Sequence, residues 1–254
     1  MSTGDHPQPR ALPPLEAGER IDQPTFHERY AAMPGGKWAE LIGGVVTMVS
    51  PLFDDHGSGD FGVGGWLFQY QRFTPGVRGG HNVSTILGPD HEVQPDLQLR
   101  VRESHGGRAR VEGGYVVGPP ELVVEVGHSS RSQDLGPKKA AYESAGVLEY
   151  LFLGIEPEEV RGFALREGRF EELAPGADGI HRSETFPGLW LDAGALFAED
   201  LDALIAALER GARHARACPI RRRPGGPEDL NQRGSRASPR RTSRPRASVA
   251  SSTA

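Results

Sequence analysis

The most unusual residue in the sequence is an acidic side chain inside an apolar run. Glu125 stands within LVVEV (122–126), a run that predicts a strand buried on both faces. A carboxylate in such a strand is costly unless it is paired, hydrogen-bonded or bound to a metal ion. Three interpretations therefore stay open for Glu125: a buried ion pair, a strand end that reaches solvent, and a functional acid.

A second acid, Asp96, follows Pro95 and opens the predicted strand that precedes the Glu125 strand. If the two strands pair, both carboxylates can face one pocket. Mg²⁺ is bound in proteins through one or two carboxylates, with water and substrate oxygens completing the shell. The pair predicts a Mg²⁺ (or Mn²⁺) site held by Asp96 and Glu125. The alternative for Asp96 is a turn residue after proline.

A cation and a further acid complete the candidate set. Gly127 shares a face with Glu125 by strand alternation but has no side chain, and His128 points to the other face. Lys138, on the next predicted helix, can reach back and offset charge that develops on a phosphate; the alternative is a solvated helix lysine. Glu40 alternates with apolar residues in the first hairpin, so it either faces water or supports the site.

The elements that position these residues alternate between strands and helices. We predict helices at 26–32, 60–73, 132–145 and 194–213, strands at 82–87, 95–101, 120–126, 148–153, 160–165 and 169–173, and a hairpin at 38–50. Gly43-Gly44 is the hairpin turn, Pro137 suits the first turn of the third helix, and 103–113 is a loop. This order predicts an α/β or α+β domain around one mixed sheet.

Composition divides the 254 residues into three parts. Residues 1–24 predict a flexible leader, 25–215 a globular domain, and 216–254 a disordered basic tail rich in Arg, Ser and Pro. The net charge of −5 splits into +9 − 2 = +7 for residues 219–254 and −12 for the remainder. The tail is either a phosphate-contacting or a solubilising segment. One cysteine, no secretory signal and no apolar run of about 20 residues indicate a soluble, cytoplasmic protein.

Motifs of several other chemistries are absent from the sequence. Ser58 lacks the first glycine of a nucleophile elbow, and no phosphate-binding P-loop or dinucleotide fingerprint occurs. The histidines lack HExxH spacing, and a single cysteine cannot form a typical structural zinc site.

Taken together, a chain of motifs resembles a known family. The motifs are Glu40-Leu41-Ile42, Gly44, Ser50-Pro51, His56, Gln94-Pro95-Asp96, PELVVEV (120–126), Ser129-Ser130, Asp134, Lys138, Tyr142, Gly146-Val147, Glu149-Tyr150 and Phe186-Pro187-Gly188-Leu189. They resemble the bacterial Uma-two-like restriction endonuclease family of the PD-(D/E)XK superfamily, from about residue 26 to about residue 210.

The resemblance implies a restriction-endonuclease-like core, a central mixed β-sheet flanked by helices, and Mg²⁺-dependent hydrolysis of phosphodiester bonds in DNA. Asp96 and Glu125 match the metal-binding acids, and Glu40 matches a recurrent acid near the first strand. Gly127 occupies the usual lysine position of the superfamily, whereas Lys138 matches the lysine that this family carries on the next helix.

Two departures keep a second function open. Gly43 and Val45 stand where the family often has acids, which favours a catalytically weak or inactive module that binds nucleic acid or protein. A domain of net charge −12 repels DNA, so DNA binding requires an additional source of positive charge or binding surface. Such a contribution can come from the tail, from homodimerisation, or from the four arginines near the predicted loop, at positions 100, 102, 108 and 110.

Overall fold

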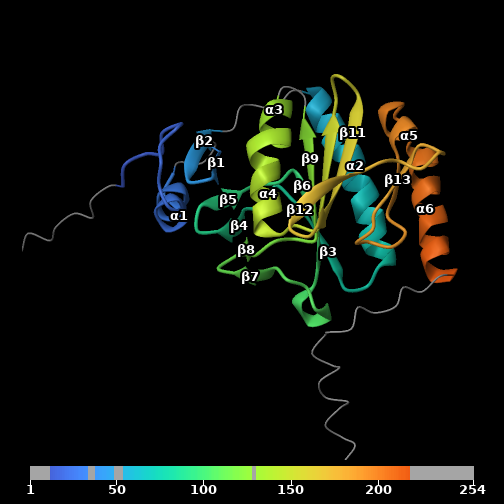
Figure 1. Ribbon diagram of the computed structural model, residues 1–254, viewed down its shortest axis with the longest axis horizontal. Coiled ribbons are helices and arrows are strands. Elements are labelled where there is room, and N and C mark those ends of the chain that lie inside the picture. Colours follow the sequence, from blue (N-terminus) through green and yellow to red (C-terminus); the bar gives the residue numbers. More distant parts are fainter. Residues whose placement is uncertain (1–11, 34–37, 49–53, 128–129, 218–254) are drawn as a thin grey trace, which may run out of the picture. The chain divides into compact units, whose positions relative to one another are not determined.

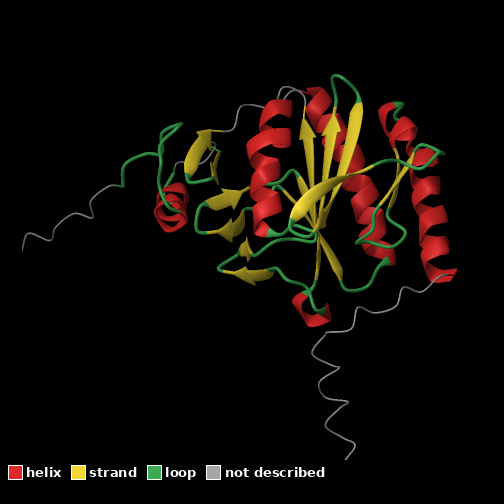
Figure 2. Cartoon of the chain, viewed as in Figure 1, coloured by secondary structure: helices red, strands yellow, loops and turns green. Residues whose placement is uncertain are grey.

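The computed structural model describes residues 12–33, 38–48, 54–127 and 130–217, and it confirms a mixed α/β fold. In this part of the chain two six-stranded mixed sheets and a two-stranded ribbon are flanked by helices (Figures 1 and 2). The expectation of one mixed sheet was wrong. Six short strands were not predicted because three to five residues show too little alternation to recognise.

The strands of sheet A, in order across the sheet, are β2 (Val45–Met48), β1 (Ala39–Ile42), β5 (His91–Val93), β4 (Thr85–Gly88), β8 (Tyr115–Val117) and β7 (Arg110–Glu112). Those of sheet B are β12 (Arg169–Leu173), β11 (Glu159–Arg166), β10 (Glu149–Gly154), β9 (Leu122–Gly127), β6 (Leu97–Val101) and β3 (Val77–His81). The ribbon pairs β13 (Ile180–Arg182) with β14 (Trp190–Asp192).

The helices are α1 (Gln23–Ala31), α2 (Asp54–Phe73), the 3₁₀ turn η1 (Glu103–His105), α3 (Arg131–Gln133), the π-helical turn η2 (Asp134–Lys138), α4 (Lys139–Ala145), α5 (Ala193–Phe197) and α6 (Leu201–Ala217). None of the described helices combines the length and the apolar character of a membrane-spanning segment.

The centre of sheet B carries the predicted buried strands. β9 and β10 run parallel, joined by the helical segment α3–η2–α4, and every residue of both strands is buried. β6 lies antiparallel on the other side of β9, with Leu97 opposite Val124. Burial on both faces explains why both strands read as continuous apolar runs.

The two faces of sheet B pack against different partners. Leu122, Val124 and Val126 belong to a core cluster with α2 and α6. Val123 and Tyr142 belong to a second cluster, which also contains residues of sheet A. Figure 1 accordingly shows α4 and α2 on opposite faces of sheet B. Glu125, which has the parity of Val123, therefore lies on the α4 face.

The first hairpin forms as predicted. Ile42 pairs with Val45, and Gly43 and Gly44 both have positive φ, +60° and +71°. A two-residue turn with positive φ at both positions matches the twist of the strands that it joins. This turn holds β1, and with it Glu40, at a defined register in sheet A.

Several predicted boundaries were wrong. Residues 12–22 are not a loose leader, because Leu15 is buried and Gly18 donates a backbone hydrogen bond to Val46. The helical segment begins at Arg131, and Gly136, whose backbone is non-helical (φ −109°, ψ −105°), divides it; Pro137 then opens the second part, as predicted. The predicted loop 103–113 contains η1 and β7, and the predicted helix 194–213 is divided into α5 and α6. His128, the side chain of His56 and the basic tail lie outside the described residues.

Candidate active site

Glu125 lies in the middle of β9, with only 2% of its surface exposed. The Tyr142 hydroxyl on α4 donates a hydrogen bond to its Oε1. Burial raises the pKa of Glu125 well above its usual value, and Lys138 opposes that effect. Asp96, together with two other acids, raises the pKa of Glu125 further. The carboxylate is therefore a buried group whose protonation depends on its charged neighbours.

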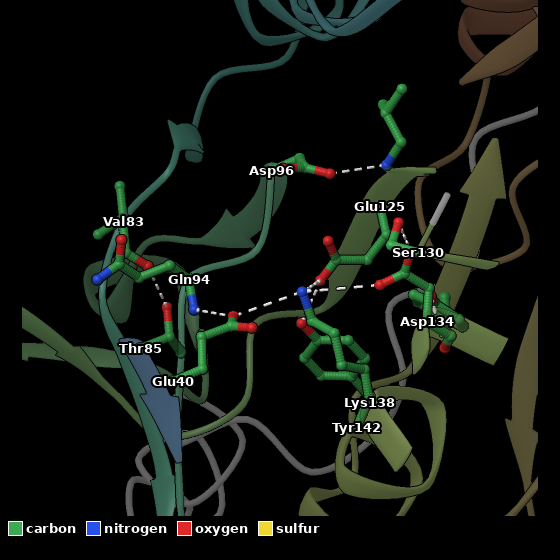
Figure 3. Close-up of polar contacts among 12 residues, drawn as sticks. Glu40, Val83, Thr85, Gln94, Asp96, Glu125, Ser130, Asp134, Lys138 and Tyr142 are labelled. Atoms are coloured by element: carbon green, nitrogen blue, oxygen red, sulfur yellow. Dashed lines mark hydrogen bonds and ion pairs between the residues drawn. The ribbon is translucent and has the colours of Figure 1, made fainter. Parts of the chain in front are cut away.

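Lys138 is the centre of the cluster (Figure 3). Its Nζ lies 2.8 Å from Glu125 Oε1, 3.4 Å from Glu40 Oε1 and 3.9 Å from Asp134 Oδ1, although only 6% of the residue is exposed. Burial alone would lower the lysine pKa, but the surrounding carboxylates, Glu125 first, hold it well above its usual value. The surrounding carboxylates therefore favour the charged ammonium form of Lys138 inside the protein. The alternative of a solvated helix lysine was wrong.

Glu40 is buried rather than facing water. Its exposed fraction is 3%, and its Oε1 accepts a hydrogen bond of 2.7 Å from the backbone N–H of Gln94. The same oxygen is the one that faces Lys138 at 3.4 Å. The pair links sheet A to the helical segment that covers sheet B, so both sheets contribute to the cluster.

Asp96 directly precedes β6, in the strand neighbouring Glu125. Its Oδ2 accepts a 2.8 Å hydrogen bond from the backbone N–H of Val126, and its charge raises the pKa of both Glu125 and Lys138. The two predicted metal ligands thus lie on adjacent strands and within electrostatic reach of each other. In Figure 3 the Asp96 carboxylate points toward the β9 backbone, whereas that of Glu125 points toward Lys138.

Comparison with known proteins assigns the chain to a family. A family model named Uma2 and described as "Putative restriction endonuclease" matches residues 24–194, about two thirds of the chain. The chain belongs to the Uma2 family. No curated protein sequence matches it.

A solved structure supports the fold of this Uma2 chain. It is the crystal structure of a "putative nuclease belonging to DUF820" from Anabaena variabilis ATCC 29413. The two share 15% sequence identity with a TM-score of 0.51, over 67% of this chain and 96% of that one. At this identity the likeness shows the restriction-endonuclease-like fold alone.

The structure shows why this Uma2 chain has no side chain at position 127. A Cβ at Gly127, the usual lysine position, would lie 2.5 Å from Cε2 of Phe152 and 3.1 Å from Oδ2 of Asp134. Phe152 pairs with Glu125 across the parallel strands and fills that space. A side chain at 127 would therefore collide with the core, and the ammonium reaches the cluster from the neighbouring helical segment instead.

Two members of the cluster were not among the predicted site residues. Asp134 is 4% exposed, and its Oδ2 accepts a hydrogen bond from the Ser130 hydroxyl. Burial raises its pKa to about 6, while Lys138 and Ser130 oppose the shift. Tyr142 is fully buried. The signal was present in the sequence: residues 130, 134, 138 and 142 are all polar and four apart, a spacing that places them on one face of a helix.

Proposed function

We propose that this chain hydrolyses phosphodiester bonds of DNA with the aid of Mg²⁺ or Mn²⁺. Membership of a restriction endonuclease family supports a nuclease function. The observation that carries the finer proposal is the position of the Lys138 Nζ, within 4 Å of three buried carboxylates and within the field of Asp96. A cluster of this composition can bind a cation and a phosphate side by side.

The charge balance of the cluster fits a divalent cation. Four carboxylates, those of residues 40, 96, 125 and 134, surround a single ammonium, Lys138. The formal excess is three negative charges, and burial together with this excess raises the pKa values of Glu125 and Asp134. A divalent ion would neutralise most of the excess and favour the ionised acids.

The proposed Mg²⁺ or Mn²⁺ ion would take two carboxylate ligands from the protein. Within the described ranges, no three His, Cys, Asp or Glu side chains are grouped so that they could hold a metal ion. Asp96 and Glu125 would hold the ion as two oxygen ligands, and water and phosphate oxygens would complete its shell. When bound, the ion would supply a water of lowered pKa and stabilise charge on the phosphate.

The remaining side chains have separable roles in the proposed reaction. Lys138 neutralises the phosphate at which water attacks and the leaving-group bond breaks, because an ammonium offsets the charge that develops there. Tyr142 holds the Glu125 carboxylate through its hydroxyl hydrogen bond. Glu40 fixes Lys138 from the opposite sheet. Both are positioning residues, since each acts through another member of the cluster.

The decisive experiment combines nuclease assays with conservative variants. The purified chain is incubated with supercoiled plasmid and with labelled oligonucleotides, in Mn²⁺, in Mg²⁺ and in EDTA. We expect metal-dependent cleavage that is lost in Asp96→Ala, Asp96→Asn and Lys138→Met. Asp96→Asn keeps an oxygen that can accept from the Val126 N–H, so its loss of activity would not reflect unfolding.

The neighbouring lysine provides the matched control. Lys139 Nζ lies over the Phe163 ring, 4.3 Å from its centroid, and away from the carboxylates. Lys139→Met should therefore cleave at the parental rate. Cleavage that persists in Asp96→Asn would refute the assignment of the acids. Metal-dependent DNA binding without cleavage would instead support the rival function, an inactive binding module with the same fold.

Other properties of the chain stay predictions. The basic tail can contribute phosphate contacts through counterion release, and homodimerisation can enlarge the nucleic-acid interface. A cytoplasmic location is expected from the single cysteine.

A further inference from the structure

Three arginines gather at one end of the sheet face that carries Glu125. Arg100 on β6 lies directly opposite Arg78 on β3. Arg102 follows β6, and its backbone N–H continues the pairing by donating 2.7 Å to Gly76 O. Alternation places Arg100 and Arg102 on the same side of the strand, and a cross-strand pair shares its face. Like charges directly opposite each other destabilise a sheet, so this arrangement needs a reason.

Arg100 is buried and has no hydrogen-bond or ion-pair partner in the part of the chain that the structure describes. Only 8% of its surface is exposed, its Nε has no acceptor, and it forms no hydrogen bond or ion pair with a described residue. Arg29 has the same exposure but bonds to Glu19 and to two backbone carbonyls. A buried guanidinium whose Nε has no acceptor is unfavourable, and an anion that accepts from it would offset the cost.

The charges around Arg100 also favour a bound anion. Burial lowers the pKa of Arg100, and the charges of Arg78 and Arg102 lower it further. Glu121 opposes these effects, but its two oxygens already accept hydrogen bonds from backbone N–H groups of residues 101 and 108. Arg78 and Arg102 are both exposed, so an anion could approach the buried guanidinium between them.

The arginines share a sheet face with the candidate acids. Gln98, between Asp96 and Arg100, donates a hydrogen bond of 3.2 Å to Thr85 of sheet A, so this face of sheet B points toward sheet A. Four residues of strand, about 13 Å, separate Asp96 from Arg100. A separation of this size places the arginines beside a neighbouring part of a bound backbone, away from the phosphate at the acids. Guanidinium groups match phosphate oxygens through paired N–H donors.

We propose that Arg78, Arg100 and Arg102 form a phosphate-binding subsite that holds the nucleic-acid backbone at a distance from the reacting phosphate, about four strand residues along β6 from Asp96. The placement of this subsite relative to a cleaved phosphate rests on the proposed function, whereas the existence of the phosphate-binding site does not. Such a subsite supplies the local positive charge that a body of net charge −12 needs in order to hold DNA.

Binding without metal tests the subsite separately from catalysis. The full chain is titrated against labelled single- and double-stranded oligonucleotides in EDTA, with fluorescence anisotropy read at several NaCl concentrations. We expect Arg78→Gln combined with Arg102→Gln to weaken binding at least tenfold and to reduce the slope of log K against log salt by about 2. The matched control is Arg161→Gln combined with Arg166→Gln, two arginines on β11 that are paired with glutamates.

Inorganic phosphate distinguishes a free anion from a nucleic-acid backbone. Phosphate should raise the melting temperature of the parent chain but not that of Arg100→Gln, which should itself melt no lower than the parent because an unpaired buried charge is removed. Protection by phosphate together with oligonucleotide binding that the double variant leaves unchanged would overturn the nucleic-acid assignment. Absence of protection, or equal losses in the control, would overturn the site.

The outcomes for the two proposals are separable. If the arginine variants leave binding intact while the parent cleaves DNA, the subsite is wrong and the nuclease function stands. If DNA binds through the arginines but no metal supports cleavage, the subsite stands and the nuclease function is wrong.

Discussion

Removal of the Lys138 charge is the perturbation whose effect the structure defines best. Lys138→Met keeps an unbranched side chain of similar length but leaves Glu125, Glu40 and Asp134 together without their counter-charge. At an effective dielectric constant of about 20, a charge pair at 2.8 Å is worth about 6 kcal/mol. Desolvation of both groups offsets much of this energy. Removal of one partner from a buried pair costs about 3–5 kcal/mol, and we expect a loss in that range at pH 7.

The assay is urea unfolding in EDTA, with a double-mutant cycle. In the Lys138→Met background, Glu125→Gln removes a buried charge that has lost its partner. The double variant should therefore lose about 1–3 kcal/mol less unfolding free energy than the sum of the two single losses. The loss in Lys138→Met should also shrink at pH 5, where the remaining acids take up protons. Lys139→Met should change the free energy of unfolding by about 1 kcal/mol or less.

A small effect would refute this reasoning. If Lys138→Met cost less than about 1 kcal/mol at pH 7, a buried ammonium that holds three carboxylates could not be correct. Additive effects of Lys138→Met and Glu125→Gln would likewise show that the two groups do not interact in the folded chain.

Three further predictions concern the same cluster. Burial raises the pKa of Asp134 to about 6 in the folded chain, so the folded state binds the proton more tightly than the unfolded state does. The free energy of unfolding should therefore fall by up to about 3 kcal/mol as pH rises from about 4 through about 6. In Asp134→Asn, urea unfolding at several pH values should show a decline that is smaller by this amount. Gly127→Ala should destabilise by about 1–3 kcal/mol in thermal melts, because its Cβ would collide with Phe152, and an unchanged melting temperature would exclude that collision. Tyr142→Phe should lose about 1.5–3 kcal/mol of unfolding free energy, since a buried carboxylate loses its hydroxyl donor; a loss below about 0.5 kcal/mol would contradict the hydrogen bond to Glu125.

Local pattern was sufficient for much of the fold. The apolar runs around 122–126 and 148–153 predicted the two buried strands, and Gly43-Gly44 predicted the first turn, because strand alternation, burial and turn geometry are properties of neighbouring residues. Glu125 was recognised as unusual from residue type and position, whereas Asp96 and Lys138 were selected with the aid of the family resemblance. Strands of three to five residues carry too little pattern, and β3, β5, β7, β8, β13 and β14 were not predicted for that reason.

The partners of each charged side chain depended on the tertiary structure. Glu40 alternates with apolar residues in sequence, yet the second sheet buries it against Lys138. Nothing local distinguishes Arg100 from an ordinary strand arginine until β3 places Arg78 opposite it. Whether a charged side chain is paired, buried without a partner or solvated depends on atoms contributed by distant segments. The sequence by itself therefore identified which residues could do chemistry, and only packing between the sheets and helices decided which of them meet.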